Sequence, residues 1–332
     1  MEIDLHITNK CNLQCKHCVY DSGILTMPDM SLSTVKELNK GFKKMNVKEV
    51  HITGGEPLLN SEIFDIINFL HNEGYIVRMQ SNGFLIDDSI AKKLKNSGID
   101  HILISIDGPE DIHNKFRNNE KSFQYAINAV KICLKNKIFT RINTVISKLN
   151  ITHLEEFMKK MSNFNVDQHS FFYLTPIGRG KNLKNYILSL TEWEKIKSHI
   201  TFHAKKLNYF HKIKIQNVFS DGEDYNGCRK DNCLIMSNGN VYHCVFFVGT
   251  KYYLGNIFKS NICEIWGSLN FLLNKININL NKNKYLSTIS CNGCCPGMLN
   301  CFNNSVLSHN LICNASHKLI PGCIRTYAKE EV

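Results

Sequence analysis

Three cysteines near the N-terminus are spaced so that they could share one metal centre. Cys11, Cys15 and Cys18 form a C-x3-C-x2-C run. Three thiolates on one short loop can hold three corners of a four-iron cluster and leave the fourth iron without a protein ligand. A structural zinc site requires four ligands, and no fourth candidate lies beside this run. The spacing therefore predicts an iron–sulfur cluster with one iron open to a further ligand.

The C-terminal third carries most of the other cysteines. Ten of the chain's fourteen cysteines follow residue 218. Disulfides are rare in the cytosol, so in a cytosolic protein these residues are first interpreted as metal or cluster ligands. Zinc is the alternative for the C-x2-C pair in this region. The loop-rich sequence predicts a small domain stabilised by bound metal rather than by a large apolar core.

Length and composition indicate a globular, cytoplasmic protein. The 332 residues, 43% of them hydrophobic, are enough for about two domains. No apolar run is long enough to cross a membrane, and Glu2 and Asp4 stand where a signal peptide would be basic or apolar. The net charge of +11 comes from lysines scattered over helix-like segments. We therefore expect neither a nucleic-acid partner nor a membrane.

Short strands alternate with helices over the first two thirds of the chain. The expected strands are 2–8, 49–53, 76–81, 101–107, 140–147 and 169–174. The expected helices are 31–45, 61–73, 87–97, 122–136, 150–163 and 191–207, with Ser31 and Asp87 as N-caps. Alternation of this kind predicts an α/β fold with a parallel sheet, here an open, partial (β/α)6 barrel. The cysteine run follows the first strand, at the end where such barrels place active-site loops.

These motifs together resemble the radical S-adenosylmethionine (SAM) superfamily. In that family the C-x3-C-x2-C triplet binds the cluster whose open iron takes the amino and carboxylate groups of SAM. Residues 54–57 read Gly-Gly-Glu-Pro, as in the family's GGEP element, and residues 105–107 end the fourth strand as Ser-Ile-Asp. The resemblance implies that Glu56 accepts from the SAM ammonium and that Arg117 pairs with the SAM carboxylate. The full set of implied SAM contacts is Tyr20, Gly54, Gly55, Glu56, Pro57, Ser81, Asn82, Ser105, Asp107 and Arg117.

The C-terminal cysteines resemble the SPASM extension of radical SAM enzymes that modify peptides. This implies a radical SAM partial barrel over 1–217 and a small cysteine-rich SPASM-type iron–sulfur domain over 218–332. The match departs where Ser305 replaces a cysteine and where six residues rather than five separate Cys294 from Cys301.

The SPASM resemblance also implies two auxiliary [4Fe-4S] clusters. The first would take Cys228, Cys233, Cys244 and Cys313, and the second Cys291, Cys294 or Cys295, Cys301 and Cys323. Whichever of Cys294 and Cys295 is the cluster ligand, the other is left over together with Cys133 and Cys263. Cys133 and Cys263 are expected to pack in the interior.

The resemblance implies an oxidoreductase that generates a 5′-deoxyadenosyl radical. SPASM relatives are mostly maturases of ribosomal peptides, so we expect a crosslink, thioether or epimerisation in a peptide or small protein. Val245 stands where anaerobic sulfatase-maturing enzymes have an aspartate that acts as a base, which counts against formylglycine formation. Sulfatase maturation and small-molecule or cofactor-biosynthesis chemistry are the alternatives.

The resemblance also implies cofactors and partners. The cofactors would be SAM and three [4Fe-4S] clusters, and the electrons would come from a low-potential donor of the flavodoxin or ferredoxin type. Many peptide maturases carry an N-terminal leader-binding domain, for which the residues before Cys11 leave no room. We therefore expect the peptide to be held by the barrel mouth, including residues 176–180, by the C-terminal domain or by a separate leader-binding protein.

Overall fold

The computed structural model describes residues 1–24, 26–216, 232–250 and 252–269. Its strands are β1 Glu2–His6, β2 Glu49–Thr53, β3 Ile76–Ser81, β4 His101–Ser105, β5 Phe139–Ile146, β6 Gln168–Tyr173, β7 Ile213–Ile215, β8 Asn232–Ile235, β9 Asn240–Tyr242 and β10 Gly255–Asn256.

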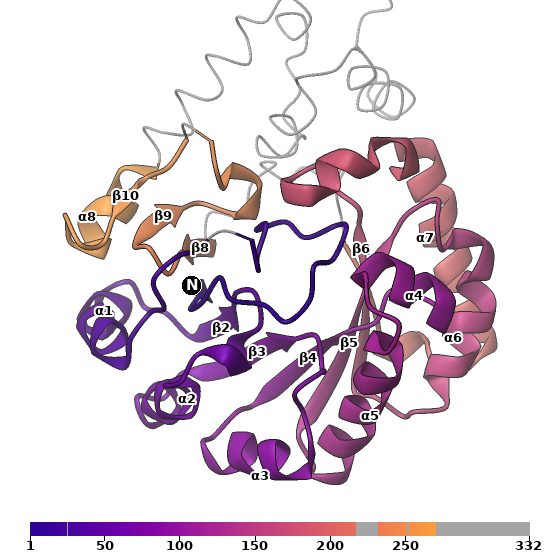
Figure 1. Cartoon of the computed structure of the whole chain (residues 1–332), viewed down its shortest axis with the longest axis horizontal. Coiled ribbons are helices and arrows are strands. Elements are labelled where there is room, and N and C mark those ends of the chain that lie inside the picture. The colour runs from indigo at the N-terminus through magenta and orange to yellow at the C-terminus, as the bar shows by residue number, and fades with distance from the viewer. Residues whose placement is uncertain (25, 217–231, 251, 270–332) are drawn as a thin grey trace, which may run out of the picture.

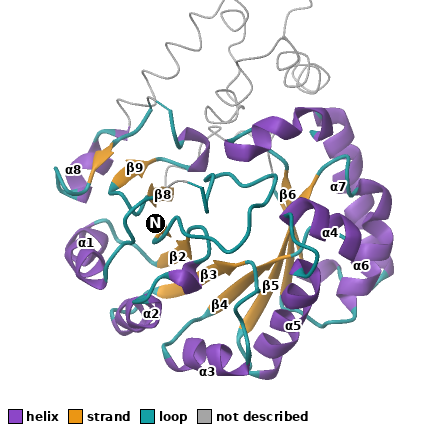
Figure 2. Cartoon of the chain, in the orientation of Figure 1, coloured by secondary structure: helices purple, strands orange, loops and turns teal. Residues whose placement is uncertain are grey.

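All of these strands belong to one sheet. Its order is β10-β9-β8-β1-β2-β3-β4-β5-β6-β7. The eight strands from β8 through β1 to β7 in this order all pair parallel with their neighbours. Strand β9 pairs antiparallel with both β8 and β10. The sheet bends into an arc with helices along its outer side (Figures 1 and 2). Because β10 and β7 remain at the two edges, the arc is an open partial barrel.

Helices follow most of the strands, and all but the last of them lie between successive parallel strands in the sequence. They are α1 Leu32–Lys44, α2 Ile63–Asn72, α3 Asp88–Asn96, α4 Glu110–Arg117, α5 Ser122–Lys135, α6 Leu154–Ser162, α7 Leu190–Lys206 and α8 Ile262–Gly267. Short 3-10 turns cover Pro57–Leu59, Ile151–His153, Gly178–Tyr186, Phe210–Lys212 and Val245–Phe247. None of the helices in the described ranges has both the length and the apolar character needed to span a lipid bilayer.

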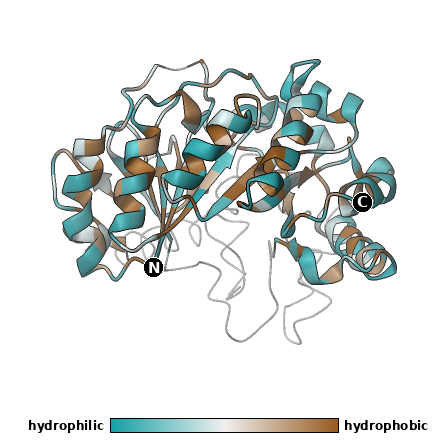
Figure 3. Ribbon diagram, turned by 90° about the horizontal axis from the view of Figure 1, so that it is seen from below, coloured by the Kyte–Doolittle hydropathy of each residue, from teal (hydrophilic) through white to brown (hydrophobic). Residues whose placement is uncertain are grey.

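Alternate residues of each strand face the helices or the inside of the arc. On β1, Ile3 and Leu5 are fully buried in the core beneath the helices, whereas Glu2 and Asp4 line the inside. The helices turn their hydrophobic residues toward the sheet and their polar residues outward (Figure 3). Since the helix-facing residues form the main core, the inward-facing ones are free to be polar.

The six predicted strands are confirmed to within two residues at each end. Both predicted N-caps are also confirmed. Ser31 accepts a hydrogen bond from the Thr34 amide at 3.2 Å, and Asp87 accepts one from the Ile90 amide at 2.7 Å. Local signals sufficed here because caps and β-branched runs act over a few residues.

Six helices and strands were not predicted: α4, β7, β8, β9, β10 and α8. Helix α4 has only eight residues, and β7 has three, so neither offers a long periodic pattern. Strand β8 lies in the cysteine-rich part of the chain and pairs parallel with β1. The predicted domain division at 217/218 falls in a stretch outside the described residues and stays a prediction.

Candidate active site

A cavity of about 770 Å³ lies inside the arc of strands. This volume is in the range of about 300–1,000 Å³ that small-molecule sites occupy. Of the predicted site residues, the cavity is lined by Cys11, Cys15, Cys18, Tyr20, Gly54, Gly55, Ser81, Asn82, Ser105, Asp107, Arg117 and Cys244. Glu56, Pro57 and Cys233 are not among its lining residues. The fold therefore gathers most of the described candidates at one place.

The first three cysteines lie on a loop over residues 9–23, the cysteine loop, which follows β1 across the arc (Figure 1). The loop is closed by a hydrogen bond from the Gly23 amide to the Asn9 carbonyl at 2.9 Å. All three cysteines are free thiols. The Leu13 amide donates to the Cys11 sulfur at 3.5 Å, and a guanidinium nitrogen of Arg117 lies 3.6 Å from the Cys15 sulfur. Donors aimed at sulfur favour thiolates.

The two glycines after β2 let the cysteine loop pass close to them. A Cβ on Gly54 would lie 2.5 Å from the Thr8 carbonyl oxygen, and one on Gly55 would lie 2.1 Å from that of Lys10. The Gly55 and Glu56 amides each donate to one of these carbonyls at 2.8 Å. The glycine pair thus lies close to the chain's own backbone, and this contact fixes the start of the cysteine loop.

Glu56 lies behind this glycine pair and is fully buried. Its carboxyl oxygens accept from the Ser81 hydroxyl at 2.9 Å, the Asn82 amide at 2.8 Å and the Leu58 amide at 3.4 Å. Burial raises its pKa to about 7, against the lowering effect of these hydrogen bonds. The observed contacts of Glu56 therefore orient the turn after β3.

Asp107 and Arg117 form a buried ion pair at the end of β4. Arg117 donates to the same carboxylate oxygen through Nε at 2.8 Å and through a terminal nitrogen at 2.7 Å. The other oxygen accepts from the Val145 amide at 3.0 Å. Burial is the largest single effect and raises the pKa of Asp107, but Arg117, His17, His113 and the Val145 amide together outweigh it and hold the pKa at about 2. Arg117 therefore lies between a carboxylate and the Cys15 sulfur with a fixed orientation.

A chain of side-chain hydrogen bonds runs along the inside of the arc from β5 to β4. The Arg141 Nε donates to Asn143 Oδ1 at 2.8 Å, and Asn143 Nδ2 donates to Gln80 Oε1 at 2.6 Å. Gln80 Nε2 in turn donates to the Ser105 hydroxyl at 2.6 Å. This order leaves the Ser105 hydrogen available to an acceptor in the cavity.

The segment after β6 braces the cysteine loop from the other side. Arg179 donates to the Cys15 carbonyl at 2.7 Å and to the Ser22 carbonyl at 3.0 Å, and its amide donates to the Cys18 carbonyl at 2.9 Å. Gly178 has a φ of +53°, and a Cβ there would lie 2.3 Å from the Cys18 carbonyl oxygen. Residues 176–180, expected at the barrel mouth, thus include Arg179 in the cavity lining and fix the loop that carries the thiols.

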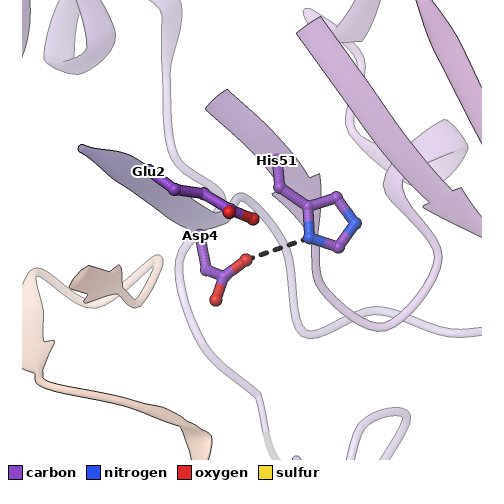
Figure 4. A group of neighbouring side chains, drawn as sticks. All are labelled: Glu2, Asp4 and His51. Atoms are coloured by element: carbon purple, nitrogen blue, oxygen red, sulfur yellow. Dashed lines mark hydrogen bonds and ion pairs between the residues drawn. The ribbon is translucent and has the colours of Figure 1, made fainter. Parts of the chain in front are cut away.

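Acidic and imidazole groups gather on β1 and β2 within the same cavity. Ligand atoms of Glu2, Asp4 and His51 all lie within 4.8 Å of one another (Figure 4). Asp4 accepts from the His51 ring at 2.9 Å and from Asn232 at 3.1 Å. Glu2 forms an ion pair with Arg78. Both carboxylates are therefore already engaged by protein groups.

The predicted auxiliary ligands are only partly described. Cys244 lines the cavity, whereas Cys233 is fully buried in the main hydrophobic core. The remaining ones lie outside the described residues: Cys228, Cys291, Cys294, Cys301, Cys313 and Cys323. The auxiliary clusters therefore stay a prediction. Cys133 is fully buried in the core, as expected of a packing residue.

Sequence reasoning missed two residues that hold Asp107. His17 is buried with its Nε2 3.6 Å from the Asp107 carboxylate, at a position between two cysteines that no motif marks. Asn150 donates through Nδ2 to the Asp107 and Val145 carbonyls, both at 2.7 Å. An asparagine in the turn after the fifth strand was the only signal for the second.

The described thiols and donors suit an iron–sulfur cluster with SAM. Burial raises the pKa of Cys11 to about 12, so an isolated thiolate there is unfavourable, and a metal ion that displaces the proton relieves this cost. The cysteine loop offers three sulfurs, so a four-iron cluster held by this loop would have one iron open to a further ligand; Cys244 is the other cysteine that lines the cavity. Cys11, Cys15 and Cys18 would hold the cluster, and Arg117 and Ser105 would face SAM.

Two family models match the chain. Residues 5–161 match the radical SAM superfamily, and residues 228–295 match the SPASM iron–sulfur cluster-binding domain. The chain is 25% identical to the AdoMet-dependent heme synthase of Nitratidesulfovibrio vulgaris over 284 residues, 78% of this chain and 77% of that protein. It is 26% identical to the mycofactocin maturase MftC of Mycolicibacterium smegmatis over 260 residues, 76% of this chain and 66% of that protein.

A solved structure has the same fold. Streptococcus suis SuiB, bound to its precursor peptide SuiA, superposes with a TM-score of 0.71 and 18% sequence identity over 92% of this chain and 72% of SuiB. The two family models, the partial barrel and the thiol-lined cavity agree with one another. The chain is thus an enzyme of the radical SAM superfamily, with a SPASM iron–sulfur cluster-binding domain.

Proposed function

We propose that this enzyme binds SAM in the cavity beside a [4Fe-4S] cluster held by Cys11, Cys15 and Cys18, and that it modifies a peptide or small protein. The observation that carries the proposal is the meeting of three free thiols and the buried Asp107–Arg117 pair at one cavity. When bound, the cluster and SAM supply one-electron radical chemistry that releases 5′-deoxyadenosine and methionine.

The chain's own residues orient the bound groups. Arg117 is anchored on Asp107 and carries a positive charge beside Cys15, so it suits the carboxylate of SAM. The free hydrogen of Ser105 suits a ribose or carboxylate oxygen. Glu56 would act through Ser81 and Asn82, whose positions it fixes by hydrogen bonds. Rigid positioning of this kind lowers the entropic cost of reaching a reactive geometry.

The peptide substrate is supported by the comparisons. The MftC relative is named a maturase, and SuiB was solved with a precursor peptide. The proposal includes the two auxiliary clusters, the domains 1–217 and 218–332 and the low-potential electron donor. The auxiliary clusters would accept the electron that a substrate loses in a net oxidation.

Small-molecule chemistry is the second candidate. It is favoured by the relative named AdoMet-dependent heme synthase, because the match covers 77% of that protein's length. Sulfatase maturation has less support because Val245 lines the cavity and offers no carboxylate as a base.

The cluster proposal is tested with a variant that replaces Cys11, Cys15 and Cys18 by Ala. Anaerobically reconstituted protein should lose about four irons per chain and all 5′-deoxyadenosine formation with SAM and dithionite. Cys263→Ala is the matched control, because this thiol lies on α8, is not among the residues that line the cavity, and donates to the Gly41 carbonyl at 3.7 Å. Persistent 5′-deoxyadenosine formation in the triple variant would refute the proposal.

The peptide proposal needs a separate test. Short peptides encoded beside this gene can be co-expressed with the enzyme and examined by mass spectrometry. A loss of about two mass units indicates crosslinking or oxidation, and a gain of about one in deuterated water indicates epimerisation. Unmodified peptides together with active SAM cleavage would favour the small-molecule candidate.

A further inference from the structure

From the proposed SAM site the cavity extends along the inward faces of the strands toward their N-terminal ends. Four arginines line it: Arg78, Arg117, Arg141 and Arg179. Arg78 pairs with Glu2 and Glu49, Arg117 pairs with Asp107, and Arg179 donates to main-chain carbonyls. Among the described residues, only Arg141 of this set has neither a carboxylate nor a main-chain carbonyl as its partner.

Arg141 is nevertheless held in place. Its Nε donates to Asn143, and its guanidinium lies over the Phe172 ring at 5.7 Å. With Nε used, the two terminal nitrogens form a planar fork that can donate to one carboxylate. Burial and the neighbouring Arg78 lower its pKa to about 10, so the side chain stays charged at neutral pH.

The surroundings of Arg141 also favour an anion. The two carboxylates opposite, Glu2 and Asp4, are engaged with Arg78 and with His51 and Asn232. Arg141 is half-buried, and the stabilising effect of Glu2 on its charge does not outweigh the cost of burial, so a ligand carboxylate would reduce the cost that remains.

We propose that Arg141 binds a carboxylate of the substrate at the end of the cavity that lies nearer the N-terminal end of β5. The inference rests on the proposed function and narrows its substrate to carboxylate-bearing molecules. In a peptide the group is an aspartate or glutamate side chain, and in a small molecule it is a carboxylic acid such as the side arms of a porphyrin.

The position of Arg141 on β5 also sets how far it lies from the proposed SAM site. It precedes Val145 by four residues on β5, which is about 13 Å of strand. Val145 lies at the level of Asp107, where SAM is proposed to bind. Arg141 therefore lies about 13 Å along β5 from the level of Asp107, and the Asn143–Gln80 chain connects the two levels through Ser105.

Equilibrium binding to the cluster-loaded enzyme with SAM, without reductant, tests this inference. One probe pair is coproporphyrin III and its neutral tetra-amide. The other is an end-blocked short peptide with one glutamate and its glutamine counterpart. We expect one carboxylate probe to bind at least about tenfold more tightly than its neutral partner. The pair that shows the preference identifies the source of the carboxylate.

Three variants test whether the preference for the carboxylate probe depends on Arg141. Arg141→Gln should abolish it, and Arg141→Lys should retain part of it, because a point charge lacks the planar fork. Lys131→Gln removes one charge from the exposed side of α5 and should leave it unchanged.

Two outcomes would overturn the inference: equal binding of carboxylate and neutral probes, including no binding of either, or a preference that survives in Arg141→Gln. The assay requires no turnover. Wild-type enzyme that forms 5′-deoxyadenosine but shows no carboxylate preference would therefore refute this inference and leave the proposed function standing.

Discussion

The guanidinium of Arg179 donates to the carbonyl of Cys15 at 2.7 Å, although 164 residues separate the two in sequence. The same side chain also donates to the Ser22 carbonyl. Arg179 therefore connects the part of the cysteine loop that carries the thiols to the C-terminal end of this loop. A loop without regular secondary structure is thereby fixed by the segment that follows β6. This contact indicates that the geometry of the thiols depends on a distant part of the chain.

Arg179→Ala should loosen the loop-bound cluster. Two carbonyls lose a charged donor, a change that typically costs about 1.5–3 kcal/mol per hydrogen bond. We expect faster loss of iron to a chelator and a weaker EPR signal from the cluster that responds to SAM. Arg179→Lys should fall between wild type and Arg179→Ala, because lysine keeps the charge but not the fork. Identical iron loss in all three proteins would show that the clamp is not needed.

Gly178→Ala should destabilise the protein by more than backbone strain alone. Its φ of +53° disfavours any side chain, and the added Cβ would also lie 2.3 Å from the Cys18 carbonyl oxygen. Gly249→Ala is the matched control, because Gly249 has a φ of +72° and no atom within 4 Å of its added Cβ. We expect a loss of about 1 kcal/mol for Gly249→Ala and a clearly larger loss for Gly178→Ala in urea unfolding. Equal losses would mean that the loop adjusts freely.

Arg117→Met should cost about 3–5 kcal/mol of unfolding free energy, because it leaves the buried Asp107 carboxylate without its partner. Adding Asp107→Asn should recover part of that loss. The exposed i,i+4 pair Lys92–Asp88 is the control, and Lys92→Met should cost far less than Arg117→Met, because solvent screens this pair. Urea unfolding of the cluster-free proteins measures all three. A loss for Arg117→Met no larger than that for Lys92→Met would contradict the assignment of a buried pair.

His169 should make the protein less stable in acid. Burial, with a contribution from Arg141, lowers its pKa from 6.5 to about 3. Between these values the unfolded chain binds more protons than the folded chain, so the free energy of unfolding falls as pH falls from 6.5 toward 3. His169→Phe removes this contribution and fills the same space among Phe157, Phe171 and Tyr209.

The measurement compares urea unfolding of wild type and His169→Phe at several pH values below 6. Wild type should lose up to about 1.4 kcal/mol per pH unit more than the variant. Other buried histidines, among them His17 and His113, titrate in both proteins and cancel in the difference. Parallel pH profiles would show that His169 does not have a lowered pKa.

The sequence by itself determined the local elements and the ligand spacing. Strand limits, the caps at Ser31 and Asp87 and the thiol triplet all depend on residues a few positions apart, where propensity and spacing act directly. Parallel pairing of the successive strands also followed, because a helix between two strands carries the chain back to the end where the next strand starts in the same direction.

Only the tertiary structure decided which side chains meet in the cavity. Glu56 matches a motif, yet its observed partners are Ser81, Asn82 and Leu58, while Arg141 matches none and lies in the cavity. Contacts such as Arg179 to Cys15 depend on strand register and loop closure over more than a hundred residues. No local periodicity encodes that pairing, because it follows from how the strands and loops pack together in the folded chain.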